Sequence, residues 1–383
     1  MVMEAKREGF KEIYIPLENI AEGKLVKDIE VYPVTSLKQL VLHLNGVQKI
    51  KPLPKENILR NLDRAYDVDF SDVKGQPVAR RALEIAAAGG HSILMMGSPG
   101  CGKTMLARRL VTILPPVTEA EALEITKIYS IVNMLPNAES VMVERPFRSP
   151  HHSVSASALL GGGTYPRPGE VTLSHNGVLF LDELPEFERA ALEMLRQPLE
   201  DGEVNISRVR GSMNFPSKFL LVAAQNPCPC GYYGDTLKHC VCKQKAIDNY
   251  RKRISGPLLD RIDMQINLKR VEFSELKAKA SGECSAEIRK RVVKARDVQL
   301  ERFAGSNIYC NAQMTRREVT QYCQLDEETQ AVLGKYFTAL NLSARSHDRI
   351  LKVARTIADL AGSSKITTTH IAEAIQLRTN ING

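Results

Sequence analysis

The segment from residue 97 to residue 104 is the feature of this sequence that most constrains its fold. It fits the pattern G-x-x-x-x-G-K-[S/T] at every defined position, follows the apolar run 93–96 and precedes the helical pattern 105–110. Glycines there let backbone N–H groups surround phosphate oxygens, and the start of a helix adds partial positive charge. A glycine-rich turn without function does not account for the full pattern in this context. The segment therefore predicts a strand–loop–helix unit that binds the phosphates of ATP through Gly97, Ser98, Pro99, Gly100, Cys101, Gly102, Lys103 and Thr104.

Two acidic residues lie where a later apolar run ends. Val178–Leu181 is typical of a central parallel strand, and Asp182 and Glu183 follow it directly. Carboxylates at the carboxyl end of such a strand face the crevice in which ligands bind. We expect Lys103 to contact the β- and γ-phosphates, and Thr104 and Asp182 to hold Mg²⁺. Glu183 would orient and polarise the attacking water. The alternative is a pair of acids without function at a strand exit, which is common in isolation but less probable about 80 residues after a phosphate-binding loop.

A third apolar run, Phe219–Ala224, also ends in polar residues, Gln225 and Asn226. A polar side chain at the end of a buried strand needs a hydrogen-bond partner. An amide that lies between the γ-phosphate and the attacking water would have one, so Asn226 is a candidate sensor of the phosphate. The alternative is that Asn226 begins a turn before Pro227.

Two C-x-C pairs of cysteines, separated by nine residues, follow this run. Their members are Cys228, Cys230, Cys240 and Cys242. Four thiolates at this separation can reach one tetrahedral centre, and Zn²⁺ is the expected occupant in a reducing cytosol. Its role would be structural, fixing the loop behind Asn226. The commoner spacing is C-x₂-C, His239 is an alternative ligand, and four free thiols are the alternative to a metal site.

Apolar patterning divides the chain of 383 residues, which is longer than one core usually accommodates, into four segments. These are residues 1–46, a linker at 47–66, an α/β segment at 67–271 and an all-helical segment at 272–383. The α/β segment is expected to form a mostly parallel sheet, with core strands within 92–96, 177–181, 219–224 and 262–267. The sequence has no signal peptide and no run of 18 apolar residues, so we expect a cytosolic protein without a membrane partner.

Capping patterns mark helices in the first and last segments. Ser36 with Gln39 predicts a helix that ends before Gly46, and Thr315 with Glu318 predicts another. In the last segment, apolar residues recur on one face of a further helix, at Ile350, Val353, Ile357 and Leu360.

Together these motifs are similar to those of AAA+ ATPases, and longer stretches narrow the resemblance. The stretches are Phe147–His152, Gly161–Gly163, Arg167–Glu170, His175–Glu183 and Ser255–Asp263. They resemble the magnesium-chelatase-like ComM/YifB family, and the resemblance covers nearly the whole chain. It implies an AAA+ core with an α-helical lid, in a homo-hexameric ring with ATP between subunits. Family members usually begin with a Lon-protease-like domain, of which residues 1–46 would be a C-terminal remnant, so no protease activity is expected.

The resemblance also implies roles for two arginines. Arg261 matches the arginine finger, which reaches the γ-phosphate of a neighbouring subunit. A salt bridge to Asp260 or Asp263 is the alternative. Arg345 matches the sensor-2 position at the start of a lid helix, where Arg349 could serve instead one turn later. The alternative for Arg345 is a solvated arginine on a helix.

The alternating run 204–213 predicts a hairpin with its turn near Arg210. In related helicases this hairpin projects into the pore of the ring, so the resemblance implies that Arg208 and Arg210 contact DNA phosphates. Arg167 lies in a stretch, 161–170, that resembles a second pore-facing loop. The net charge of +8 permits a polyanionic partner without requiring one. Solvation alone also explains arginines on an exposed hairpin.

The function that the resemblance implies is ATP hydrolysis coupled to movement along branched or single-stranded DNA. ComM-type branch-migration helicases act in this way in recombination or transformation. One alternative is a chelatase motor that drives metal insertion into a tetrapyrrole together with partner subunits. The other is an ATP-switched scaffold without enzymatic function.

Overall fold

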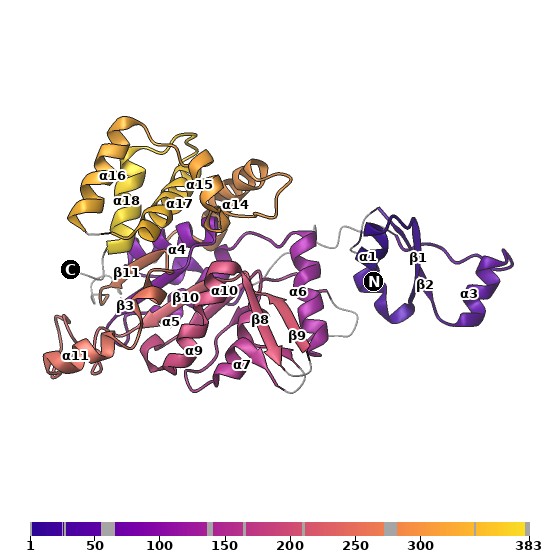
Figure 1. Cartoon of the computed structure of the whole chain (residues 1–383), viewed down its shortest axis with the longest axis horizontal. Coiled ribbons are helices and arrows are strands. Elements are labelled where there is room, and N and C mark those ends of the chain that lie inside the picture. Colours follow the sequence, from indigo (N-terminus) through magenta and orange to yellow (C-terminus); the bar gives the residue numbers. More distant parts are fainter. Residues whose placement is uncertain are drawn as a thin grey trace. The chain divides into compact units, whose positions relative to one another are not determined.

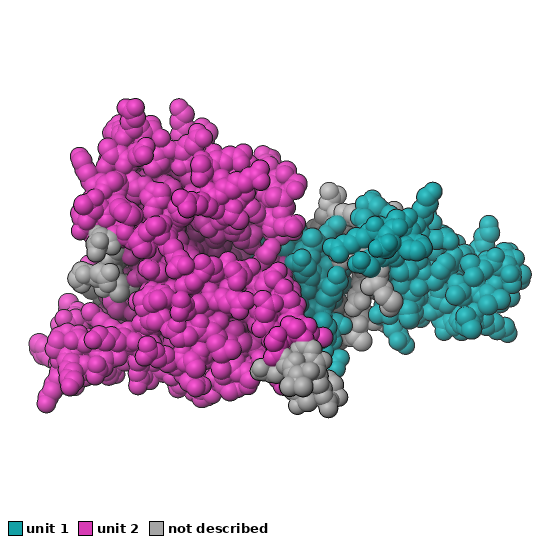
Figure 2. All heavy atoms as spheres, in the orientation of Figure 1, with its two compact units in different colours: residues 1–65, 117–145 teal, residues 66–116, 146–383 magenta. Residues whose placement is uncertain are grey.

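The computed structural model describes most of the chain, in two compact units. The described residues are 2–24, 26, 28–54, 66–135, 141–163, 166–208, 211–271, 282–340 and 342–379. Unit 1 comprises residues 1–65 and 117–145, and unit 2 comprises residues 66–116 and 146–383 (Figure 2). Residues 55–65 of the predicted linker and residues 272–281 of the predicted helical segment lie outside the described residues.

Unit 2 is built on a five-stranded sheet in which every strand runs parallel to its neighbours. In spatial order the strands are β11 (Met264–Leu268), β3 (Ile93–Gly97), β10 (Leu220–Gln225), β7 (Val178–Leu181) and β4 (Phe147–Arg148). The first four lie within two residues of the predicted runs, which confirms the α/β prediction. β4 escapes sequence analysis because two residues are too few to produce an apolar pattern.

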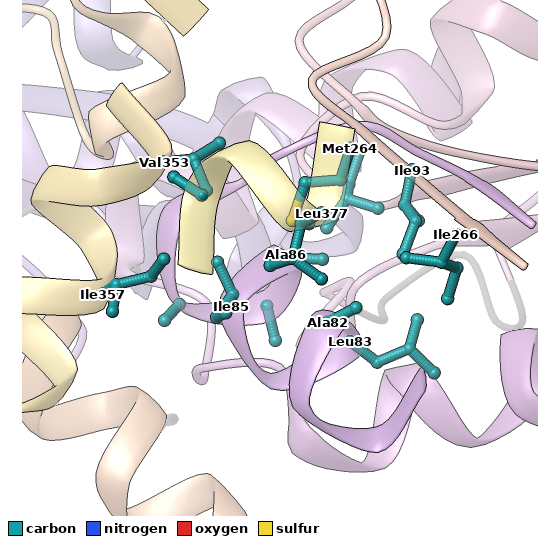
Figure 3. Close-up of a cluster of buried hydrophobic side chains, with 14 of the residues drawn as sticks. Ala82, Leu83, Ile85, Ala86, Ile93, Met264, Ile266, Val353, Ile357 and Leu377 are labelled. Carbon is teal, nitrogen blue, oxygen red and sulfur yellow. The ribbon is translucent and has the colours of Figure 1, made fainter. Parts of the chain in front are cut away.

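Helix α4 (Pro77–Gly89) is a buried layer between the sheet and the C-terminal helices. Its side chains Ala82, Leu83, Ile85 and Ala86 are fully buried. Figure 3 shows them among side chains of the sheet (Ile93, Met264, Ile266) and of the C-terminal helices (Val353, Ile357, Leu377). Because alanine carries only a methyl group, α4 can approach both neighbouring layers closely.

The C-terminal part of unit 2 is helical, as predicted, and its helices gather in one group (Figure 1). They are α14 (Ser285–Arg302), α15 (Arg316–Tyr322), α16 (Glu327–Ala339), α17 (Ala344–Leu360) and α18 (Thr368–Thr379). The predicted capping box of Thr315 and Glu318 is present at α15. Ile350, Val353 and Ile357 on α17 are each 1 % exposed, which confirms the predicted apolar face. None of the helices in the described ranges has the length and apolar character needed to cross a bilayer.

Short elements complete unit 2. They are η2 (Phe70–Asp72), α5 (Lys103–Ile113), α7 (Ala156–Leu160), β5 (Gly161–Gly162), β6 (Arg167–Pro168), α8 (Glu170–Leu173), η3 (Leu184–Glu186), α9 (Arg189–Met194), α10 (Arg196–Asp201), β8 (Glu203–Arg208), β9 (Gly211–Pro216), α11 (Gln244–Arg251), α12 (Gly256–Leu259) and η4 (Asn311–Gln313). Of these, η2, α5 and η4 contribute to the first core beside α4 or lie against it, and the remainder belong largely to a second core around Leu179 and Leu181. β8 and β9 pair antiparallel from Glu203–Pro216 to Arg208–Gly211, so the predicted hairpin is confirmed.

Unit 1 has a small core of its own. Its elements are α1 (Val2–Arg7), β1 (Glu12–Pro16), η1 (Leu17–Asn19), α2 (Ile20–Lys24), β2 (Glu30–Val34), α3 (Leu37–Leu44) and α6 (Glu119–Ile131). β1 and β2 pair in parallel, and Leu123 of α6 joins their core. Residues 117–145, which the sequence places within 67–271, thus group with the N-terminal segment. Ser36 Oγ caps α3 at Gln39 N, but the apolar face of α3 is exposed, with Leu37 at 76 %.

Candidate functional site

The predicted phosphate-binding loop joins the end of β3 to the start of α5, the arrangement that its sequence pattern requires. Gly100 and Gly102 have φ angles of +80° and +95°, a region that residues with a Cβ seldom adopt. A Cβ on Gly97 would lie 2.6 Å from Cys101 Sγ and 2.9 Å from the carbonyl oxygen of Leu268. The loop therefore depends on glycine both for its turns and for its close packing.

The ammonium group of Lys103 lies inside this loop. Its Nζ donates to the carbonyl oxygens of Gly97 (2.6 Å) and Ser98 (3.2 Å) and to Oδ1 of Asn226 (3.0 Å). Asn226 follows β10, which pairs in parallel with β3, so the ends of the two strands meet at one edge of the sheet. The structure thus brings together two residues that the sequence predicts for the γ-phosphate.

A second contact joins the next pair of predicted residues. Thr104 Oγ1 donates to Asp182 Oδ2 at 2.7 Å, and Asp182 Oδ1 accepts from the backbone N–H of Glu183 at 2.9 Å. Hydroxyl and carboxylate oxygens are the donors that Mg²⁺ prefers, and nucleotide phosphates complete its coordination in sites of this kind. The chemistry of Thr104 and Asp182 therefore fits a magnesium ion.

Glu183 has a strained backbone and an unpredicted partner. Its φ is +52°, in the left-handed region that a side chain disfavours. Its Oε2 lies 3.2 Å from Nδ1 of His152, whose ring packs on that of His151 with centroids 4.0 Å apart. The glutamate side chain is 51 % exposed, so water can reach it.

His152 is the residue near the candidate site that sequence analysis missed, although it lies in a stretch that carries the family resemblance. It follows β4, which pairs in parallel with β7, so the chain after β4 lies beside Glu183. Only the unpredicted strand β4 explains this proximity. Had β4 been recognised as a strand of the sheet, the two histidines that follow it would have indicated a residue close to Glu183.

The two predicted arginines lie together, away from the phosphate-binding loop. Arg261 is 7 % exposed in its side chain, forms an ion pair with Glu200 and donates to the carbonyl oxygen of Pro257 at 2.9 Å. Arg345 Nη2 lies 3.7 Å from Glu200 Oε1, with 57 % of its side chain exposed. The buried Nε of Arg261 has no hydrogen-bond partner among the described residues. A cavity of about 500 Å³ borders Arg261 and Glu200.

The two aspartates named as alternative partners of Arg261 lie beside other arginines. Asp263, a predicted competitor for Arg261, pairs with Arg349 and accepts from the backbone N–H of Ser92 at 3.0 Å. Burial opposes the charge of Asp263, but Arg349 and His91 hold its pKa well below the usual range. Asp260 lies 3.9 Å from Arg378. Because Arg349 is held in this buried pair, Arg345 is the arginine of α17 whose side chain extends into solvent.

The arginines and the phosphate-binding loop lie at opposite edges of the sheet. Arg261 comes just before β11, whose first residue pairs with Ile93, the first residue of β3. The phosphate-binding residues follow β3, β7 and β10 and therefore lie at the carboxyl edge. A strand of five residues spans about 15 Å. Within one chain, this separation keeps Arg261 away from the Lys103 ammonium.

The four predicted cysteines form one cluster in the loop between β10 and α11. Their Sγ atoms all lie within 4.8 Å of one another, and three of the separations are 3.4 Å, 3.7 Å and 3.6 Å. A tetrahedral centre with metal–sulfur bonds of ~2.3 Å has sulfur–sulfur edges of about 3.8 Å. The cluster therefore fits a four-thiolate zinc site; among the described residues, His239 is not part of it.

Two of the three residues predicted to contact DNA, Arg167 and Arg208, lie on two adjacent hairpins. A Cβ on Gly161 of β5 would lie 2.7 Å from Ile206 Cδ1 of β8, so the β5–β6 and β8–β9 hairpins pack together. Arg167 of β6 is exposed, and Arg208 ends β8. Arg210 lies outside the described residues. The structure gives no test of a contact with DNA.

Comparison with known proteins supplies relatives for the whole arrangement. Residues 69–276 match the family model described as magnesium chelatase, subunit ChlI, and residues 282–378 match the model of the C-terminal part of that subunit. The chain is 44 % identical over 378 residues to the competence protein ComM of Haemophilus influenzae. The matched residues make up 98 % of this chain and 73 % of that protein. The chain is 42 % identical over 380 residues to the uncharacterised protein YifB of Escherichia coli, with 98 % and 72 % covered. The magnesium-chelatase 38 kDa subunit of Rhodobacter capsulatus is 26 % identical over 176 residues, 41 % of this chain and 50 % of that protein.

Proposed function

The chain belongs to the ComM/YifB-type magnesium-chelatase-like family of AAA+ ATPases, and on this premise we propose that it binds and hydrolyses ATP at the carboxyl edge of the unit 2 sheet. The observation that carries the proposal is the pair of contacts from Lys103 to Asn226 and from Thr104 to Asp182. They join three strand ends, and the contacting residues are 123 and 78 positions apart in the sequence. Such convergence of a lysine, an amide and oxygen donors favours phosphoryl chemistry over a structural role.

Each residue of the site then has a task set by its chemistry. Lys103 and the backbone N–H groups of the loop bind the phosphates, and Asn226 orients the γ-phosphate and the attacking water. Thr104 and Asp182 would hold Mg²⁺, which neutralises phosphate charge when it is bound. Glu183 accepts a hydrogen bond from the water and aligns it for in-line attack on the γ-phosphorus.

We propose that the active form is a homo-hexameric ring in which Arg261 and Arg345 act on the ATP of a neighbouring subunit. The support is the position of both arginines at the amino edge of the sheet, opposite the phosphate-binding edge of the same chain. When the amino edge of one copy meets the carboxyl edge of the next, the contact is head-to-tail, and such contacts form a ring when the rotation between copies closes. Positive charge supplied across this contact would stabilise the charge that develops during phosphoryl transfer.

DNA is the partner that we propose for the ring, with translocation or branch migration in recombination or transformation as the outcome. The support is the relative whose name is competence protein ComM, together with the adjacent β5–β6 and β8–β9 hairpins. Arg167, Arg208 and Arg210 would bind phosphates there without regard to sequence. The magnesium-chelatase match favours a second candidate, an ATPase motor for metal insertion, which predicts no response to DNA. An ATP-switched scaffold predicts that function survives the loss of hydrolysis.

We also propose that the cysteine cluster binds one structural Zn²⁺. Its sulfur separations and its four thiol donors support this, as does the reducing cytosol that the sequence predicts.

The test is the ATPase rate of the full chain with and without branched and single-stranded DNA, measured across a series of salt concentrations. A helicase-like motor should show stimulation that falls steeply as salt rises, because binding to phosphates releases counterions. If DNA neither binds nor stimulates turnover at low salt, the DNA proposal fails while ATP hydrolysis stands. Absence of hydrolysis in the assembled ring would refute the ATPase proposal itself.

A further inference from the structure

The cysteine loop, defined as residues 228–242, lies directly against the phosphate-binding loop. Gly231 has a φ of +83°, and a Cβ placed on it would lie 2.6 Å from Cδ and 2.7 Å from Cγ of Pro99. The backbone of the cysteine loop therefore touches Pro99 with no side chain between them. Any larger residue at position 231 would push the two loops apart.

Asp235 forms a second point of contact between the loops. Its side chain is 2 % exposed and accepts from the backbone N–H groups of Leu237 (2.8 Å) and Lys238 (3.1 Å). The nearby hydroxyl of Ser98, these backbone bonds and Arg270 at 3.6 Å lower the pKa of Asp235 to about 2. Asp235 therefore places the turn between the two cysteine pairs beside Ser98.

The start of the cysteine loop and the helix that follows it both lie beside Asn226. Asn226, the hydrogen-bond partner of Lys103, comes two residues before Cys228. Tyr250 on α11, beyond Cys242, lies beside the backbone of Asn226, and burial raises the pKa of Tyr250 to about 12. The loop therefore begins next to the group that holds the lysine in place, and the helix that follows the loop returns to that group.

We propose that the four-cysteine site is a metal-dependent clamp on the phosphate-binding loop: bound Zn²⁺ holds Gly231 against Pro99 and Asp235 against Ser98, and so raises the affinity for ATP. The inference rests on the proposed ATP binding and adds a linkage between two ligands. Without the metal, fifteen residues of loop are fixed mainly by short-range contacts, and the outer wall of the phosphate-binding loop loosens. By thermodynamic reciprocity, ATP must raise the affinity for Zn²⁺ by the same factor.

The experiment uses the full chain and measures two ligands separately. Zinc content is determined with a chromogenic chelator, and the Kd of a fluorescent, non-hydrolysable ATP analogue is determined before and after the zinc is removed. We expect one zinc per chain, about tenfold weaker nucleotide binding without it, and, in equilibrium competition with the chelator, a Kd for zinc about tenfold lower when the analogue is bound. The double variant Cys228→Ser, Cys230→Ser should behave like the zinc-free protein, whereas Cys284→Ser, outside the cluster, should behave like the unmodified chain.

Two variants keep every cysteine and test the contacts themselves. Gly231→Ala and Asp235→Asn should retain zinc but weaken nucleotide binding by about fivefold and reduce its dependence on zinc. Gly234→Ala is the matched control for the first, because Gly234 has a similar φ of +76° but open space around its Cβ position. The exposed Asp248→Asn is the control for the second.

The outcomes separate the clamp from the proposed function. Equal nucleotide affinity with and without zinc would overturn the clamp and leave ATP binding intact. A chain that binds the analogue but no zinc would also overturn it. If the zinc-loaded, unmodified chain binds no analogue, ATP binding itself is wrong and the clamp falls with it.

Discussion

Two groups of polar residues lie at opposite edges of the unit 2 sheet. They differ in how many of their hydrogen-bonding groups find partners within one chain. At the carboxyl edge, Lys103 bonds to Asn226 and Thr104 to Asp182. At the amino edge, Arg261 has a buried Nε without a partner in the described structure, and most of the Arg345 side chain is exposed. An unsatisfied buried donor costs about 1–3 kcal/mol. The difference is the one expected if each chain holds the whole proposed phosphate-binding site and supplies its arginines to the site of a neighbour.

The substitution Arg261→Ala tests most strongly whether the two edges of the sheet differ in this way. If Arg261 acts across the subunit contact, turnover should fall by about 10³-fold or more with little change in nucleotide affinity. The measurement is steady-state ATP hydrolysis alongside a nucleotide-binding titration. Arg316→Ala, on an exposed face of α15, is the control. A variant with full turnover would show that Arg261 only pairs with Glu200.

Glu183→Gln should lower turnover by about 10²–10⁴-fold, because a neutral amide accepts the hydrogen bond from the attacking water more weakly than a carboxylate does. Nucleotide affinity should persist, since Lys103 and Thr104 are unchanged. Mixing this variant with Arg261→Ala sharpens the comparison: each chain then supplies what the other lacks, and mixed rings should recover part of the activity. Recovery requires sites shared between chains, so its absence would place both residues in one chain's site. Glu188→Gln is the exposed control.

Asp263→Asn tests whether the amino edge depends on its buried ion pair. The change leaves Arg349 buried without a counter-charge, which should reduce the free energy of unfolding by about 3–5 kcal/mol. Because folding lowers the pKa of Asp263, its contribution is complete above the unfolded pKa of ~3.9 and declines as the pH falls below it. Denaturant titrations should therefore show the two proteins converging at acid pH, and a constant difference would contradict this origin.

Arg345→Ala should have the smallest effect, about a tenfold loss of turnover, because its exposed side chain would add one charged hydrogen bond to a neighbour's phosphate. The loss should occur only in the assembled ring. If the contact of Arg345 with Glu200 has no part in turnover, adding Glu200→Gln should not change the size of the loss. Lys335→Ala on α16 controls for lost surface charge. An equal loss in that control would remove Arg345 from the site.

Sequence analysis located correctly the elements whose signal lies in short contiguous stretches. The loop 97–104 and the acids after Val178–Leu181 carry both their chemistry and the strand that positions it. Because parallel strands end at one edge, the meeting of Lys103, Asp182 and Asn226 could be expected from order along the chain alone.

The rest depends on contacts that no local pattern encodes. Glu200 lies 61 residues before Arg261 and has no periodic signal that points to it. His152 approaches Glu183 only because the two-residue strand β4 pairs with β7. The sequence also separates the cysteine loop from the phosphate-binding loop by more than a hundred residues, so the contact of Gly231 with Pro99 required the folded chain.

The burial of α4 on both sides bears on how a motor of this kind would transmit force. Its alanine-rich surface touches the sheet on one side and α17 on the other, and Arg81 ties it to Glu373 at 2.8 Å. Close-packed interiors are stiff and transmit strain. In the proposed ring, we therefore expect the sheet and the C-terminal helices to move as one rigid body, so that any motion driven by ATP hydrolysis occurs at the contacts between neighbouring copies.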